Sequence, residues 1–384
     1  MLIVAGCSYT STYADGFGPV ESDYQPKTLV SCNGKLYLLY HGACPTRGLY
    51  LWDITDDTLM VAGDNHGSES SIACRGDTIF VGYYHFGDSA ITVRASYDGG
   101  RGWSTVLVVD SSDFAEDEPA LLLSGDTLYL TFVYEISGPE IRIYRVPLGG
   151  FDTLRGVIHT PYVSHNSPLF RSPDGDLYIL ASSWDIEGGG YVLRYDGSIW
   201  HYGEVLPSGM PYDMGFVGGR IVVAGVSGPR DNRDVVVCLS DTSLNFSCSK
   251  VAESVGRVTN VALVVGVPTY LVWSDNSQGR FRLKMLYTED FISWSPFSIG
   301  TYLPSVSNSY YPVASLYGGE IYVAYTTDAP GRPSVELLKV GKNGTVENLN
   351  THRSRCGYYD KAGRRVPPKR SRVVLGCGTG YIRR

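Results

Sequence analysis

Apolar and polar residues alternate along this chain in short runs, and one combination of runs recurs throughout the sequence. An alternating apolar run, a turn that contains glycine and a second run rich in tyrosine and aliphatic residues follow one another in seven places. Alternation with a period of two, bounded by Gly, Asp, Asn and Pro, indicates half-buried β-strands. The pattern therefore predicts seven β-hairpins. Their turn glycines are Gly34, Gly76, Gly125, Gly175, Gly218, Gly266 and Gly318.

Each hairpin is followed by two further predicted strands. A polar loop leads to a third alternating segment, such as 90–96 or 234–240, and a tight turn leads to a fourth. Consecutive turn glycines are 42, 49, 50, 43, 48 and 52 residues apart, close to the ~40–50 residues of a four-stranded propeller blade. The sequence contains no convincing helical stretch. We therefore predict an all-β fold, a seven-bladed β-propeller of four-stranded antiparallel blades, with a six-bladed propeller as the alternative.

The repeats assign most of the chain to one domain. Residues 26–350 form the predicted propeller, with seven repeats of about 47 residues, while residues 1–25 form an N-terminal strand or extension and residues 351–384 a C-terminal tail. The short apolar segments 2–7 and 373–377 are expected to cover an exposed sheet edge, or else to be irregular extensions.

Composition supports strands over helices. The 384 residues include 45 Gly, 29 Tyr and 20 Pro, and only 18% are charged, which favours turns and aromatic strands. No apolar run approaches the ~18 residues that a membrane-spanning helix needs, so no transmembrane segment is predicted. Residues 351–384 carry +9, whereas the whole chain carries −7. Such a basic tail either stays solvated or docks on an acidic protein or on nucleic acid.

The eight cysteines show no metal-binding pattern. None of them belongs to a Cys-x-x-Cys pair, so neither a zinc site nor a cofactor is predicted. Cys238 and Cys248 flank a predicted hairpin loop, where they would form either a cross-strand disulfide or two free thiols. The first residues lack the basic segment and the long apolar core of a secretory signal. These features do not decide the location, and an extracellular or virion surface is favoured over the cytoplasm.

One turn carries a family motif. Residues 96–103 (SYDGGRGW) lie between the third and fourth strands of the second repeat. They resemble the Asp-box, S-x-D-x-G-x-x-W, of the sialidase-like (BNR-repeat) β-propellers, and degenerate versions stand at 240–246 and 288–294. The four matching residues are Ser96, Asp98, Gly100 and Trp103. The resemblance implies a structural role, in which Asp and Ser side chains bond the turn at the blade periphery, away from substrate.

In a propeller, the first strands of the blades start around one mouth of a central channel, and convergent polar groups there are the default ligand site. These starts carry carboxylates, imidazoles, phenols and amides, the groups that bind sugar hydroxyls and move protons. The candidate catalytic residues are Glu118, Asp64, Glu69, Asp213, His66, His165 and Tyr311. The candidate substrate-binding residues are Asp117, Asn166, Tyr212, Arg257, Asn260 and Tyr310.

Two chemistries fit these residues. A glycosidase needs two carboxylates about 5–10 Å apart across the glycosidic bond, and Glu118 is the preferred acid because a crowded mouth raises a carboxyl pKa. The resemblance to BNR-type proteins implies a second chemistry, that of polysaccharide lyases, in which His66, His165 and Tyr311 would abstract a proton beside a uronate. Sialidases clamp a carboxylate with three arginines, whereas only Arg257 lies at a first-strand start. Typical sialidase activity is therefore not expected.

These features predict a glycan-recognising, sialidase-like β-propeller that binds carbohydrate at one mouth of its central channel. Whether it is an enzyme stays open, and as an enzyme it would be a glycoside hydrolase or a polysaccharide lyase. The alternative is a non-catalytic attachment or structural propeller of a virion or cell surface. A second partner, protein or nucleic acid, is predicted for the basic tail at 351–384.

Overall fold

The computed structural model describes the chain from the first repeat to the last, with gaps at several loops. The described residues are 24–42, 48–63, 67–85, 90–110, 115–134, 140–148, 154–159, 168–182, 189–297, 299, 308–327, 334–341, 345–349, 358–359, 365–366, 376–377 and 380–381. Within these ranges the regular elements are β-strands, labelled β1 to β32 in chain order.

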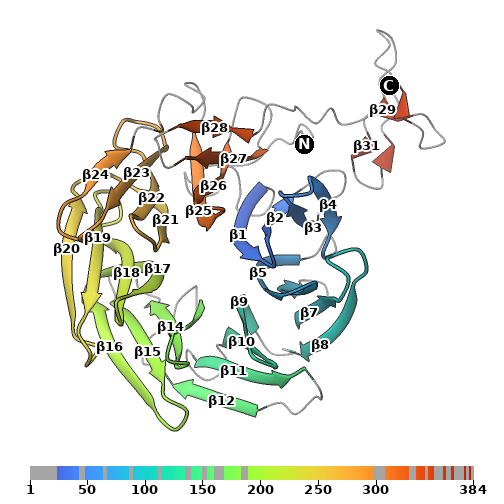
Figure 1. Cartoon of the computed structure of the whole chain (residues 1–384), viewed down its shortest axis with the longest axis horizontal. Coiled ribbons are helices and arrows are strands. Elements are labelled where there is room, and N and C mark those ends of the chain that lie inside the picture. Colours follow the sequence, from blue (N-terminus) through green and yellow to red (C-terminus); the bar gives the residue numbers. More distant parts are fainter. Residues whose placement is uncertain are drawn as a thin grey trace.

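Seven antiparallel sheets of four strands each are arranged in a ring (Figure 1), which confirms the seven-bladed prediction over the six-bladed one. Each sheet is a blade that takes its strands from consecutive segments of the chain. Blade 1 contains β1 (Tyr24–Cys32), β2 (Lys35–Gly42), β3 (Gly48–Asp53) and β4 (Thr58–Val61). Blade 2 contains β5 (Gly67–Arg75), β6 (Thr78–His85), β7 (Ala90–Ser96) and β8 (Ser104–Asp110). Blade 3 contains β9 (Ala115–Ser124), β10 (Thr127–Tyr134), β11 (Glu140–Pro147) and β12 (Leu154–His159).

The other four blades follow the same order. Blade 4 contains β13 (Leu169–Arg171), β14 (Leu177–Ser182), β15 (Gly190–Tyr195) and β16 (Trp200–Leu206). Blade 5 contains β17 (Gly209–Val217), β18 (Arg220–Ser227), β19 (Asp234–Ser240) and β20 (Phe246–Ala252). Blade 6 contains β21 (Val258–Val264), β22 (Thr269–Asp275), β23 (Arg282–Thr288) and β24 (Ser295–Phe297). Blade 7 contains β25 (Ser309–Tyr317), β26 (Glu320–Thr327), β27 (Ser334–Val340) and β28 (Val346–Asn348).

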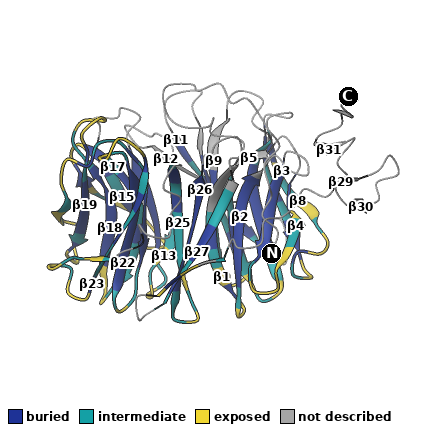
Figure 2. Cartoon of the chain, turned by 90° about the horizontal axis from the view of Figure 1, so that it is seen from above, coloured by how far each residue is buried: buried dark blue, intermediate teal, exposed yellow. Residues whose placement is uncertain are grey.

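The first strand of each blade lies nearest the axis of the ring. β1 contacts β5 and β25, β5 contacts β9, and β21 contacts β17 and β25. Because the strands of a blade run up and down in turn, all first strands start at one end of the ring, here called the strand-start end. The turns after the first strands and the hairpins after the third strands lie at the other end, the turn end, where many residues are exposed (Figure 2).

Glycine allows the tight turn between the first and second strands. Gly34 and Gly318 have φ angles of 72° and 60°, a left-handed conformation that glycine adopts without the steric cost of a Cβ atom. In the sixth repeat the same turn contains a cis Val267–Pro268 peptide bond.

A separate hydrophobic core fills the space between each pair of neighbouring blades. Leu38 and Tyr50 of blade 1 pack with Ala324 of blade 7, and this cluster closes the ring. Burying one large aliphatic side chain is worth about 1.5–3 kcal/mol, so the ring is held together mainly by the interfaces between blades. The cluster with the fewest buried residues lies between blades 3 and 4 and contains Ile141, Ile143, Leu169, Ile179, Ala181 and Leu193.

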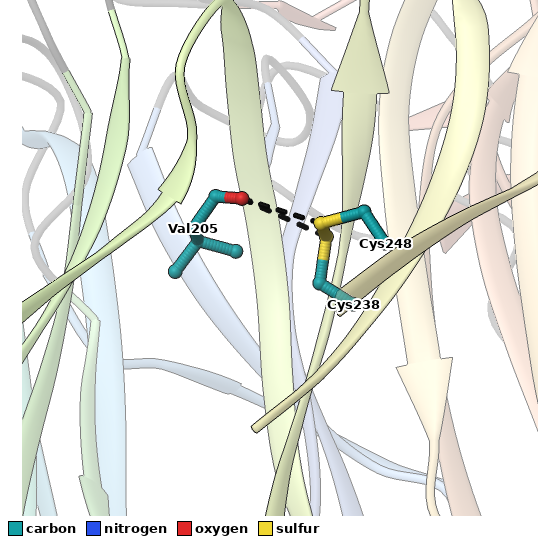
Figure 3. Close-up of a disulfide and its surroundings, with 3 residues drawn as sticks. All are labelled: Val205, Cys238 and Cys248. Atoms are coloured by element: carbon teal, nitrogen blue, oxygen red, sulfur yellow. Dashed lines mark hydrogen bonds between the residues drawn. A yellow bond between two sulfur atoms is a disulfide. The ribbon is translucent and has the colours of Figure 1, made fainter. Parts of the chain in front are cut away.

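Two disulfides connect described strands. Cys238 of β19 and Cys248 of β20 are cross-strand partners with Cα atoms 3.9 Å apart, so the disulfide alternative holds for this pair. Figure 3 shows their sulfur atoms against the carbonyl oxygen of Val205 in β16. The Cys32–Cys74 disulfide joins β1 to β5 with Cα atoms 6.1 Å apart, and it therefore links blade 1 to blade 2.

The predicted edge strands lie mostly outside the described residues, including the whole segment 2–7. Gly376–Cys377 (β31) pairs with Gly380–Tyr381 (β32) in a hairpin of its own, and Tyr358–Tyr359 (β29) pairs with Arg365–Val366 (β30). The described part of segment 373–377 thus pairs locally instead of covering a blade edge.

Candidate functional site

The first strands of six blades contain a β-bulge close to their starts. In β17, Pro211 pairs with Gly225 and Asp213 pairs with Ala224, so Tyr212 has no residue opposite it in β18. A bulge bends the strand and turns the extra side chain away from the regular alternation, and bulges are frequent beside binding sites. The bulged residues are Lys27 in β1, Glu69 in β5, 117–119 in β9, Tyr212 in β17, Thr259 and Asn260 in β21, and Tyr311 and Pro312 in β25.

Many of the residues predicted from the sequence occupy these bulges or flank them. Six stand at bulged positions, namely Glu69, Asp117, Glu118, Tyr212, Asn260 and Tyr311. Asp213 follows a bulge, and Tyr310 precedes one. For Glu69, Asp117 and Glu118 the structure describes the backbone alone. Asp64, His66, His165 and Asn166 lie outside the described residues.

Asp213 connects blades 5 and 6. Its Oδ1 accepts the N–H of Met214 at 2.8 Å, and its Oδ2 accepts the N–H of Leu263 in β21 at 2.8 Å. Although part of the residue is accessible to solvent, burial of the carboxyl group raises the pKa of Asp213 to about 7, and the two N–H donors only partly offset this rise. The carboxyl group therefore titrates near neutral pH while it holds the first strand of the next blade.

A second set of hydrogen bonds connects blades 6 and 7. The Thr259 hydroxyl accepts the N–H of Tyr311 at 3.1 Å, and Asn260 Nδ2 donates to the carbonyl oxygen of Pro312 at 2.7 Å. Tyr311 has a φ angle of 51°, which is uncommon for a residue other than glycine. The bulges of these two first strands thus bind each other directly.

Aromatic side chains accompany the described bulges. Tyr212 packs against the hydrophobic core between blades 5 and 6, and burial raises the pKa of its phenol, which is therefore a neutral hydrogen-bond donor at neutral pH. Tyr310 is buried, and its ring centroid lies 4.9 Å from that of Phe281 and 6.1 Å from that of Tyr311. This end of the ring offers both polar groups and aromatic rings.

Arg257 lies just before the bulge of β21. Its Nε donates to Oδ1 of Asp231 in an ion pair, and its backbone N–H donates to Asn276 Oδ1 at 2.7 Å. The predicted substrate-binding arginine is therefore already paired with a carboxylate of the loop between β18 and β19.

Sequence reasoning missed several of these polar contacts. Ser71 of β5 accepts the N–H of Leu121 in β9 at 2.7 Å, which repeats between blades 2 and 3 the type of connection that Asp213 makes. The residues joined by Ser71 and by Asp213 are both 50 positions apart. A polar residue in an inner strand, spaced one repeat from a partner strand, is the signal that could have identified them.

The turn end carries a different arrangement of carboxylates. Asp98 Oδ1 accepts the N–H groups of Arg101 at 3.0 Å and Gly102 at 2.8 Å, while the Ser96 hydroxyl accepts the N–H of Gly100 at 2.7 Å. The Trp103 indole donates to the carbonyl oxygen of Gly100 at 2.9 Å. The four residues selected by the motif therefore bond their own turn.

Equivalent hairpins in other blades use the same device. Thr288 and Asp290 accept turn N–H groups in blade 6, and Asp241 does so in blade 5. Asp53 in blade 1 and Asp196 in blade 4 also accept turn N–H groups, although the motif comparison did not select them. The Gly102 N–H lowers the pKa of Asp98, the Ile199 N–H that of Asp196, the Asn245 side chain that of Asp241, and the Ser293 N–H that of Asp290.

Two searches of the described ranges found no candidate. No helix there is long and apolar enough to cross a membrane, and no group of three or more His, Cys, Asp or Glu side chains is placed to hold a metal ion.

Comparison with known proteins supports the fold. No protein-family model and no curated protein matches the sequence. Among solved structures, the chain is similar to a prolyl endopeptidase with a TM-score of 0.56 and 13% identity, over 90% of this chain and 54% of that one. It is similar to the β-propeller domain of the Trilobed protease from Pyrococcus furiosus with a TM-score of 0.53 and 9% identity, over 86% and 98%. For Trypanosoma rangeli sialidase the TM-score is 0.48 and the identity 12%, over 74% and 56%. At these identities the similarity concerns the fold alone.

Proposed function

We propose that this protein is a sialidase-like propeller that recognises glycans, with carbohydrate bound at the strand-start end of the ring. The observation that supports this most directly is the bulge repeated in six first strands, which gathers residues selected independently from the sequence at one end. A bulge presents side chains that a regular strand would direct into the interface between blades. Several bulges around one axis can therefore surround a ligand.

The side chains at this end suit a sugar. Sugar hydroxyls both donate and accept hydrogen bonds, and amides, phenols and hydroxyls do the same. Asn260, Thr259 and the neutral phenol of Tyr212 supply such groups, and tyrosine rings pack against the apolar face of a sugar ring. Asp117, Asn166, Arg257 and Tyr310 complete the proposed substrate-binding set.

The turn at 96–103 supports the sialidase-like assignment. We propose that Ser96, Asp98, Gly100 and Trp103 form an Asp-box, because their hydrogen bonds stay within one hairpin at the turn end. Its place opposite the strand-start end is consistent with a structural role rather than a part in binding.

Recognition without turnover is the function that we propose, and catalysis is an outcome of its test. For hydrolysis, Glu118 would act as the acid with Asp64, Glu69 or Asp213 as the second carboxylate, and for elimination His66, His165 and Tyr311 would act together. The Asp213 carboxylate accepts two backbone N–H groups, which suits holding two blades together more than transferring protons to a substrate. Attachment to a surface outside the cell agrees with the two disulfides, which persist in oxidising environments.

A glycan array followed by product analysis tests this proposal. The wild type is compared with Glu118→Gln, with His165→Ala and with Glu289→Gln, a control at an exposed carboxylate of the turn end. Binding without products supports recognition. Products that disappear in Glu118→Gln or in His165→Ala would instead show hydrolysis or elimination. Absence of binding to every glycan would overturn the proposal.

A further inference from the structure

The charge of Arg257 is compensated before any ligand arrives. Its guanidinium pairs with Asp231, whose side chain is 72% exposed, while that of Arg257 is 31% exposed. Because a guanidinium that bonds one carboxylate presents fewer donors to another, the pair reduces the attraction of this end of the ring for an anion.

Backbone hydrogen bonds hold the two loops that carry this pair. The N–H of Arg233 donates to the carbonyl oxygen of Gly256 at 2.9 Å, and the N–H of Val255 donates to the carbonyl oxygen of Arg233 at 2.9 Å. The N–H of Asn276 also donates to the carbonyl oxygen of Arg257 at 3.2 Å. The ion pair is therefore a built part of the strand-start end, two residues from the bulge at Thr259.

The other bulged residues do not restore a positive charge. The described side chains at blades 5 to 7 are phenols, a hydroxyl and an amide, and Asp213 beside them is acidic. The bulges of blades 2 and 3 contribute three acidic residues, Glu69, Asp117 and Glu118, against the single basic residue Lys27 in blade 1. An acidic sugar would meet more like charges than opposite ones.

We infer that Asp231 is a specificity-determining residue, which pairs with Arg257 so that the strand-start end selects uncharged saccharides and rejects acidic ones. The inference rests on the proposed glycan-binding function and names the substrate class of that site. Removal of the Asp231 charge releases Arg257 to bond a sugar carboxylate. Discrimination against acidic sugars then decreases.

Matched saccharides separate charge from shape. The probes are hexasaccharides of glucose, galactose, mannose and N-acetylglucosamine, each unmodified and after oxidation at C6 to the uronate. Binding is measured by calorimetry at low ionic strength, because salt screens such charges. We expect the wild type to bind at least one unmodified hexasaccharide about tenfold or more tightly than its oxidised form, and tenfold corresponds to about 1.4 kcal/mol.

Two variants test the ion pair itself. Asp231→Asn should reduce the ratio of the two affinities by about threefold to tenfold, as expected when one partly exposed ionic contact is gained. Asp126→Asn is the control, because Asp126 forms an exposed ion pair with Arg75 at the turn end and its loss changes the net charge by the same amount. It should leave the ratio unchanged. Thermal unfolding verifies that both variants are folded.

The outcomes separate the two proposals. If the wild type binds oxidised saccharides as tightly as unmodified ones, or if Asp231→Asn leaves the ratio unchanged, the specificity role is wrong while glycan binding stands. If the wild type binds neither form of any hexasaccharide and no glycan on the array, the proposed function fails and the inference fails with it.

Discussion

At the turn end of the ring, carboxylates bind the backbone of their own hairpins, whereas at the strand-start end polar side chains bind the backbone of the next blade. Asp98 reaches Gly102, four residues away, while Asp213 reaches Leu263, 50 residues away. The first kind of contact forms within a hairpin, and the second exists only once two blades are packed together. The turn end is thus determined locally, and the strand-start end by assembly of the ring.

The same comparison appears in the electrostatics. Exposed Asp98 has its pKa lowered, first by the Gly102 N–H, because these donors stabilise its charged form. Asp213 has its pKa raised to about 7, because burial destabilises its charged form. Acid therefore acts on the two ends in opposite directions.

The largest expected effect is on the turn end. In Gly100→Ala, the new Cβ would overlap Met60 Sδ at a residue with a φ angle of 95°. We expect a loss of about 2–4 kcal/mol in the free energy of unfolding, because overpacking and an unfavourable backbone conformation add. Urea denaturation measures it.

Gly99→Ala is the matched control. Its φ angle is 73°, and a Cβ atom there meets nothing within 4 Å, so only the backbone cost of about 1 kcal/mol remains. Equal losses in the two variants would show that Met60 does not fix the turn. Because both changes lie at the turn end, saccharide affinity should stay the same.

An intermediate effect is expected from pH. The folded-state pKa of Asp213, about 7, lies above its unfolded value. Its favourable contribution is therefore complete below the unfolded pKa and is lost as pH rises through about 7. For Asp98, with its pKa lowered, the contribution is present above the unfolded pKa and is lost as pH falls through the folded one.

Variants separate these two dependences. The free energy of unfolding of Asp213→Asn and of Asp98→Asn is measured against that of the wild type between pH 3 and 8. The advantage of the wild type over Asp213→Asn should shrink as pH rises toward 7, whereas its advantage over Asp98→Asn should shrink in acid. Two advantages that change in the same direction would contradict the assigned environments.

The smallest effect compares two asparagines. Asn260→Ala removes the hydrogen bond to Pro312, which we expect to cost about 1 kcal/mol in stability and to weaken saccharide binding. Asn245→Ala removes a hydrogen bond to Asp241 at the turn end and should leave saccharide affinity unchanged. Calorimetry with the same saccharide measures both. Equal losses of affinity would remove the basis for placing the site at the strand-start end.

The sequence predicted the fold well because its signals are local. Alternation and the turn glycines mark each hairpin, and their spacing of one blade reveals the ring. The turn at 96–103 was recognised for the same reason, since Ser96, Asp98 and Gly100 interact within one hairpin. Asp53 and Asp196 show the limit of this reasoning, because they bond their turns without the surrounding motif.

The geometry of the strand-start end could not be predicted in this way. A bulge depends on the register with the partner strand, so nothing next to Tyr212 in the sequence shows that it lacks an opposite residue. The Arg257–Asp231 pair joins loops 26 residues apart, and Asp213 bonds a strand of the next blade. Sequence position selected several of these residues, but only the structure shows which groups already hold one another.

Closure of the ring has a consequence for how the protein could be rearranged. Each described blade comes from one continuous segment, and blades 1 and 7 meet through side-chain packing around Leu38, Tyr50 and Ala324. No described strand is shared across that interface, so the order of the blades around the axis does not depend on which blade is made first. A circularly permuted chain that starts in the short loop before β17 would form the same seven sheets, and the new junction would need only a linker.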